Sequence, residues 1–175
     1  MEYTFTLKYQ LADNDRDPDA LVERLGGAGC DDALVGIGQP GRLALEFTRD
    51  AANAATAVRS ALADVRRAVP SAKLIEVAPD LVGLTDVADI VGVSRQNMRK
   101  LMLAHPGSFP APVHEGSASI WHLADVLAWL QQAKGSYALA KDVLDVARVA
   151  LQVNVAKEGR RLPRSASKEL QTLVG

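Results

Sequence analysis

The sequence contains one cysteine, Cys30, in 175 residues, which excludes an internal disulfide and any zinc site built on paired cysteines. A lone cysteine is typical of a small apolar side chain buried in a reducing compartment. The sequence also lacks an apolar run long enough to cross a bilayer, and its first residues have neither the basic nor the apolar segment of a secretory signal. We therefore expect a cytoplasmic protein with no membrane partner.

Motifs of enzymes and cofactor sites are missing as well. No Gly-Lys-Ser/Thr sequence occurs, and the glycines of Gly26–Gly29 follow a predicted helix instead of opening one, which argues against a phosphate loop. Aspartates alternate from Asp13 to Asp19 as in a calcium loop, but Pro18 stands where that loop needs glycine. The histidines have no metal-ligating spacing, and no catalytic triad stands out. We expect no enzyme activity, metal or cofactor.

The near-neutral net charge of −1 hides two halves of opposite sign. Residues 1–80 carry 9 Lys and Arg against 13 Asp and Glu, a net charge of −4. Residues 81–175 carry 11 against 8, a net charge of +3. Because nucleic-acid binding depends on positive charge near phosphates, the C-terminal half is the part expected to bind a nucleic acid.

In the acidic half, segments whose apolar residues have the period of a strand alternate with segments that have the period of a helix. Residues 3–11 alternate strictly between apolar and polar, which predicts a half-buried strand. Further patterns predict a helix from Asp17 to Gly27, a hairpin of Ala33–Ile37 and Leu43–Thr48, an amphipathic helix over Asp50–Val69 and a strand over Leu74–Val77. This β-α-β-β-α-β order predicts an α+β protein whose residues 1–80 form a ferredoxin-like domain.

The basic half opens with two short helices joined by a tight turn. Thr85 is placed to cap the first helix, and Gly92 is placed to end it. Ser94 is placed to cap the second helix immediately afterwards. Two helices joined by so short a connection are typical of a helix-turn-helix.

The second of these helices has a polar, basic outer face. Met98, Leu101 and Met102 recur at helical spacing and are expected to face the core. The side chains left outside the core are Arg95, Gln96, Asn97, Arg99 and Lys100. Glutamine and asparagine pair with adenine, arginine pairs with guanine, and a capped helix N-terminus binds phosphate, so this face suits a recognition helix for duplex DNA.

The stretches LTDVADIVGVSRQNMRKL (residues 84–101), FPAPV (109–113) and IWHLADVLAWL (120–130) resemble the AlpA and excisionase-like winged helix-turn-helix group related to MerR, over about a quarter of the chain. The resemblance implies that residues 114–119 form a wing whose His114, Ser117 and Ser119 approach DNA. It also implies that a tryptophan, Trp121, opens the next helix, and that Trp121 and Trp129 are structural. Glu115 adds a negative charge to the wing, which favours contacts by the helix over contacts by the wing.

The C-terminal region, residues 135–175, follows the winged helix-turn-helix of residues 81–134. A long helix is expected from about Tyr137 to Ala156, and it has two apolar stripes. One stripe is available for a second subunit, so a homodimer is expected, although a single helix buried within a monomer explains the pattern too. Glu158–Gly175 is expected to be a loosely held basic tail.

The function predicted from these patterns is sequence-specific binding of double-stranded DNA, as in a transcriptional regulator. Residues 1–80 would then supply dimerisation, ligand binding or a surface for a protein partner. Two alternatives stay open. One is an excisionase-like or segregation factor that bends or bridges DNA. The other is an antitoxin-like autoregulator whose N-terminal domain binds a protein partner.

Overall fold

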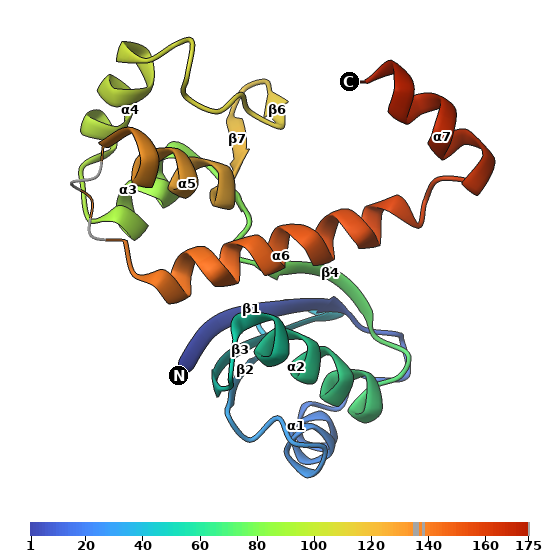
Figure 1. The fold of residues 1–175 in the computed structure, drawn as a ribbon. Helices are drawn as coiled ribbons and strands as arrows, with labels where there is room; N and C mark the ends of the chain where they lie inside the picture. The colour runs from blue at the N-terminus through green and yellow to red at the C-terminus, as the bar shows by residue number, and fades with distance from the viewer. Residues whose placement is uncertain (135–136, 138, 175) are drawn as a thin grey trace.

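The computed structural model describes residues 1–134, 137 and 139–174, apart from the side chains of residues 133–134 and 164–167. It is an α+β protein with antiparallel sheets, as expected. Figure 1 shows a sheet with two helices at one end of the molecule, a group of short helices at the other, and the long helix α6 between them. Among the described residues, no helix is long and apolar enough to span a membrane.

The N-terminal sheet has four strands in the order β2-β3-β1-β4. Their bounds are Glu2–Gln10 for β1, Ala33–Gly36 for β2, Arg42–Asp50 for β3 and Lys73–Ala78 for β4. Strand β1 pairs with β3 over its whole length, and each neighbouring pair is antiparallel. The alternation that predicted β1 buries one set of side chains in the core, namely Tyr3, Phe5, Leu7 and Tyr9.

Helices α1 (Pro18–Gly27) and α2 (Ala54–Ala68) pack on the sheet and complete this core. The Asp17 carboxylate accepts the backbone N–H of Asp19, which confirms the predicted start of α1. Helix α2 begins later than predicted because β3 continues to Asp50, and the cap is the Asn53 side chain. Cys30 is buried here, and burial raises the pKa of its thiol to about 11.

Arg49 is a buried cation at the end of β3. Its guanidinium donates two hydrogen bonds to Asp32, at 2.7 and 2.8 Å, and one to Asp64 at 2.8 Å. It also donates to the carbonyl of Gly29 at 2.7 Å and lies over the Phe47 ring, 4.8 Å from its centroid. The hydrogen bonds from Arg49 lower the pKa of Asp32 below its ordinary value.

The second half begins with a strand that the sequence analysis did not predict. Strand β5 (Leu81–Val82) pairs with β7 (Ser119–His122), which also pairs with β6 (His114–Glu115). Helices α3 (Leu84–Val91), α4 (Arg95–Ala104) and α5 (Leu123–Lys134) surround a second apolar cluster. Two residues are too few to show a strand period, so the pattern of the sequence could not indicate β5.

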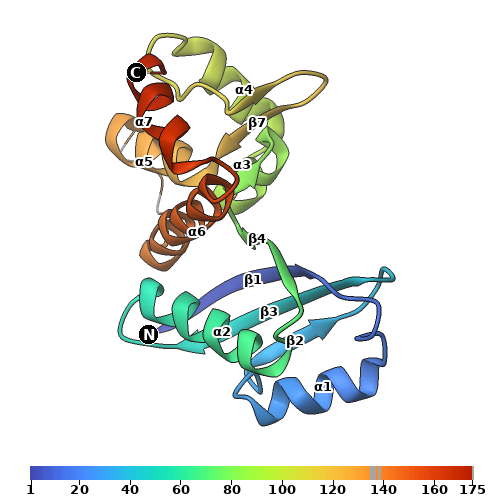
Figure 2. The same cartoon turned by 90° about the vertical axis from the view of Figure 1, so that its right-hand side faces the viewer.

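Helix α6 (Lys141–Gly159) contacts both halves of the chain. It begins at Lys141 and not near Tyr137. The domain boundary predicted after residue 134 cannot be compared with the structure, because residues 135–136 lie outside the described part. Val146 and Ala150 belong to the core of the sheet, whereas Leu144 and Ala147 belong to the core of the short helices. Figures 1 and 2 show α6 between the two halves from directions 90° apart. The middle of each apolar stripe is thus buried within one chain, and these residues are not free for a second subunit.

A buried polar cluster joins the two halves at the end of β4. Asn154 of α6 accepts the backbone N–H of Val77 and donates to its carbonyl, each at 2.8 Å. The Asn154 amide also donates to the carboxylate of Asp80 at 2.7 Å, and Nδ1 of His122 lies 2.6 Å from the other oxygen of that carboxylate. Because β4 is an edge strand, Asn154 satisfies backbone groups that another strand would otherwise pair.

The segment predicted to be a loosely held tail contains a helix. Helix α7 spans Arg164–Leu173 and follows Pro163, whose fixed φ angle suits a helix start. Its apolar side chains Leu170 and Leu173 are exposed, and no described side chain of α7 belongs to either core. Sparse apolar residues among polar ones made this segment resemble a tail in sequence.

Candidate nucleic-acid interface

The turn between α3 and α4 is fixed by one glycine and one serine. Gly92 has a φ angle of +78°, a left-handed conformation that side chains rarely adopt. The N–H of Val93 then donates to the carbonyl of Ala88 at 2.9 Å and closes α3. Ser94 caps α4 by accepting the N–H of Asn97 at 3.1 Å, as predicted. These two residues set how α4 follows α3.

The buried side of α4 is the one that the spacing predicted. Met98 is fully buried in the second core, and Leu101 and Met102 pack partly buried against it. All five predicted contact residues of this helix are exposed: Arg95, Gln96, Asn97, Arg99 and Lys100. The helix therefore presents amides and cations together to solvent.

The cations of this face are free of counter-ions. In the part of the chain that the structure describes, Arg95, Arg99 and Lys100 form no ion pair. This contrasts with Arg49 and Arg67, whose guanidinium groups are paired with aspartates in the acidic half. Unpaired cations on a convex helix are available for phosphate oxygens or guanine edges.

Leu103 is a member of this face that the sequence analysis missed. Its side chain is 60% exposed, although it lies in a helix with a buried apolar side. Positions 96, 100 and 103 recur at helical spacing, and this period places Leu103 one turn after Lys100 on the same face as Gln96. An exposed apolar side chain in such a place suits contact with a thymine methyl group.

Thr85 does not have the predicted capping role. Helix α3 begins at Leu84, and its cap is Gly83, two residues before Thr85. The Asp86 carboxylate accepts the N–H of Gly83 at 2.8 Å, so the acidic residue of the first turn satisfies the donor at the helix start. Thr85 is exposed within the first turn and keeps its hydroxyl available.

The predicted wing coincides with the hairpin of β6 and β7. His114 pairs with Ile120 and Glu115 with Ser119, and the N–H of Val113 donates to Ile120 at 2.8 Å. His114 and Ser117 are exposed, and Ser119 is partly buried. The hairpin therefore projects His114, Glu115 and Ser117 into solvent.

Aromatic side chains anchor the segment between α4 and the hairpin. Trp121 belongs to β7 instead of opening the next helix, which starts at Leu123. Its indole N–H donates to the carbonyl of Pro110 at 3.0 Å, and Trp129 donates to Ser108 at 3.3 Å. The Phe109 ring packs edge-on against both tryptophans. These contacts tie the base of the hairpin to α5.

Other kinds of site find little support. Among the described residues, no group of three or more His, Cys, Asp or Glu side chains is placed to hold a metal ion.

Comparison with known proteins gives no match: no protein-family model, no curated protein and no solved structure is significantly similar to this chain. Function is therefore inferred from the residues themselves.

Proposed function

We propose that this protein binds double-stranded DNA in a sequence-specific manner and acts as a transcriptional regulator. Helix α4 would enter the major groove, with Gln96, Asn97 and Arg99 at base edges and Arg95 and Lys100 at phosphates. The capped N-terminus of α4, at Ser94, would add backbone N–H groups toward a phosphate. His114, Ser117 and Ser119 of the hairpin and Thr85 of α3 would contact the adjoining backbone.

The observation that carries this proposal is the outer face of α4. Within the described residues, it combines two amides and three cations without counter-ions on a helix held by a glycine turn and a serine cap. A merely solvated helix needs no such combination. In the acidic half, by contrast, four of the eight exposed cations form ion pairs with carboxylates, namely Lys8, Arg16, Arg24 and Arg67. Amides and unpaired cations together supply both base recognition and phosphate attraction.

We further propose that the two parts belong to known fold types. The strand order β2-β3-β1-β4, with α1 and α2 on the sheet, supports a ferredoxin-like domain over residues 1–80. The turn at Gly92 followed by α4 and the β6–β7 hairpin supports a winged helix-turn-helix over residues 81–134. Residues 135–175 would then supply the long helix that fixes one part on the other.

Selection of bound fragments from random duplex DNA tests the proposal with the intact protein. We expect a short consensus, because Gln96, Asn97 and Arg99 each pair with a defined base edge. One palindromic site would favour a regulator acting as a homodimer, and that dimer would need a surface other than the buried stripes of α6. Several adjacent sites with a strong bend would favour the architectural alternative. Recovery of random sequence alone would contradict sequence-specific binding.

Replacing Gln96 with alanine is expected to relax the selected sequence at one base position. Loss of a bidentate amide–adenine pair costs about 1–3 kcal/mol of discrimination at that base. The same selection, repeated with Gln96→Ala, measures the change. Gln152→Ala, at an exposed position of α6, is the matched control and should return the original consensus. An unchanged consensus with Gln96→Ala would remove this residue from the interface.

A further inference from the structure

A pocket of about 640 Å³ lies between α2, β4 and the C-terminal part of α6. Its floor is apolar and includes Leu62 of α2, Leu74 of β4 and Val153 of α6, which pack against the core of the sheet. Figure 1 shows this end of α6 beside β4 and far from α4. The pocket is thus separate from the proposed DNA-binding face.

Four cationic side chains line the same pocket: Arg66, Lys73, Lys157 and Arg160. Lys157 is engaged, since it donates to the carbonyl of Ile75 and pairs with Glu158 at 2.8 Å. Arg66, Lys73 and Arg160 form no ion pair within the described residues, and no described carboxylate lines the pocket. Three elements therefore bring unpaired positive charges around one apolar floor.

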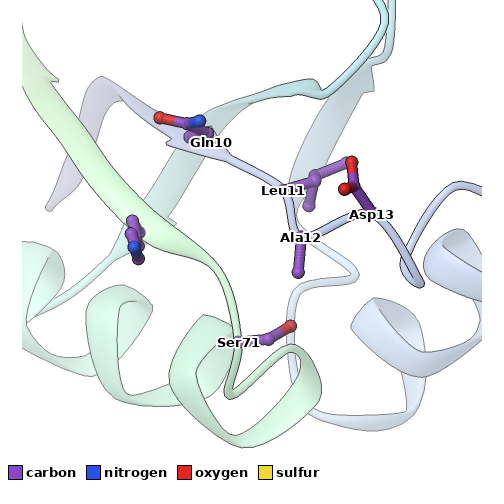
Figure 3. A pocket seen from close by; sticks show the side chains of 6 residues that line it. Gln10, Leu11, Ala12, Asp13 and Ser71 are labelled. Carbon is purple, nitrogen blue, oxygen red and sulfur yellow. The ribbon is translucent and has the colours of Figure 1, made fainter.

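A neighbouring recess, which shares Lys73 with the larger pocket, lacks this combination. The recess has a volume of about 220 Å³ and is lined in part by Gln10, Asp13 and Ser71 (Figure 3). Asp13 places a carboxylate at its wall, and its lining lacks the apolar floor of the larger pocket. An anion with an apolar body is therefore suited to the larger pocket and not to the recess.

Like charges that converge without counter-ions repel one another, and a bound anion removes that repulsion. We propose that this pocket binds a small amphipathic organic anion. A carboxylate or phosphate group of the ligand would face Arg66, Lys73 and Arg160, and its apolar chain or ring would cover Leu62, Leu74 and Val153. This site goes beyond DNA binding and does not depend on it, because its residues lie outside α4 and the hairpin.

Titration with octyl phosphate, followed by amide NMR spectra of the full chain, tests the proposal. We expect saturable shifts at Arg66, Lys73 and Val153, and much weaker binding of inorganic phosphate and of octanol, which each supply half of the chemistry. The charge-reversal variant R66E/K73E is expected to lose affinity roughly tenfold or more, because like charges would then face the phosphate. R42E/R59E, which reverses two exposed arginines outside the pocket, is the matched control and should bind as the original chain does.

Ala156→Trp separates shape from charge, since this exposed pocket position on α6 would fill the cavity and leave every cation in place. We expect this variant to lose octyl phosphate binding while its melting temperature stays close to that of the original chain. Three results would overturn the proposal: no saturable shift at these amides, equal binding of inorganic phosphate, or unchanged affinity in both R66E/K73E and A156W. Shifts at these amides with duplex DNA but not with octyl phosphate would also overturn it.

Discussion

Replacing Asn154 with leucine is expected to lower the free energy of unfolding by about 3 kcal/mol. Leucine keeps the volume of the side chain but leaves the N–H and carbonyl of Val77 without their 2.8 Å partners in a buried position. One oxygen of the buried Asp80 carboxylate loses its donor too. Each buried polar group left unpaired costs about 1–3 kcal/mol, and the apolar gain of leucine offsets part of the sum.

Urea denaturation followed by circular dichroism measures this loss. Gln152→Leu is the matched control, because it makes a similar substitution at an exposed position of the same helix and should change stability by less than about 0.5 kcal/mol. Because Asn154 joins α6 to β4, we also expect limited proteolysis to cut the Asn154→Leu variant faster near the junction at Asp80. Equal stabilities of the two variants would show that this polar cluster does not hold the halves together.

Replacing Arg49 with alanine is expected to lower the free energy of unfolding by about 3 kcal/mol or more. The change removes hydrogen bonds to Asp32, Asp64, Ser60 and Gly29 and leaves two carboxylates near each other without their shared cation. Breaking one side of a buried ion pair typically costs about 3–5 kcal/mol. Arg49→Lys keeps the charge but not the planar fork that holds Asp32 at two points, so we expect an intermediate loss.

For the Arg49→Ala variant we also predict a change in how stability depends on pH. Because Arg49 lowers the pKa of Asp32 in the folded chain, the stabilisation from this pair is complete above the unfolded carboxyl pKa of about 4. It is lost as the pH falls from there through the lowered pKa of the folded state. Urea denaturation between pH 5 and about 2 should therefore show a shallower pH dependence for Arg49→Ala than for the original chain. Arg59→Ala, at an exposed position of α2, is the control, and a parallel pH dependence for all three proteins would contradict this role.

Local patterns predicted the elements whose causes are local. The alternation of residues 3–11 gave β1, the caps Asp17 and Ser94 gave two helix starts, and Gly92 gave the turn before α4. The outer face of α4 followed from the spacing of Met98 and its neighbours. Once these residues are assigned to the core, the period of the helix fixes which side chains point outward. Much of the candidate site was therefore visible in the sequence.

Features that depend on distant partners were not visible. Local pattern cannot show that Asp80 is buried, since a carboxylate that follows a proline at a domain boundary usually faces solvent. Its partners His122 and Asn154 are 42 and 74 positions away, and only the packed chain brings them together. Leu103 was missed because an apolar residue in an amphipathic helix is normally assigned to the core.

The most direct test of DNA binding is the affinity of the double variant R99A/K100A for the selected duplex at several salt concentrations. The proposed interface predicts a loss of affinity of at least about tenfold, because each contact to a base or phosphate is worth about 1 kcal/mol or more. It also predicts a slope of log affinity against log salt that is less steep by about 1 to 2. R42A/R59A removes the same charge from the sheet half and should change neither quantity. Equal affinity and equal slope for R99A/K100A and the original chain would contradict the assignment of α4 as the DNA-binding helix.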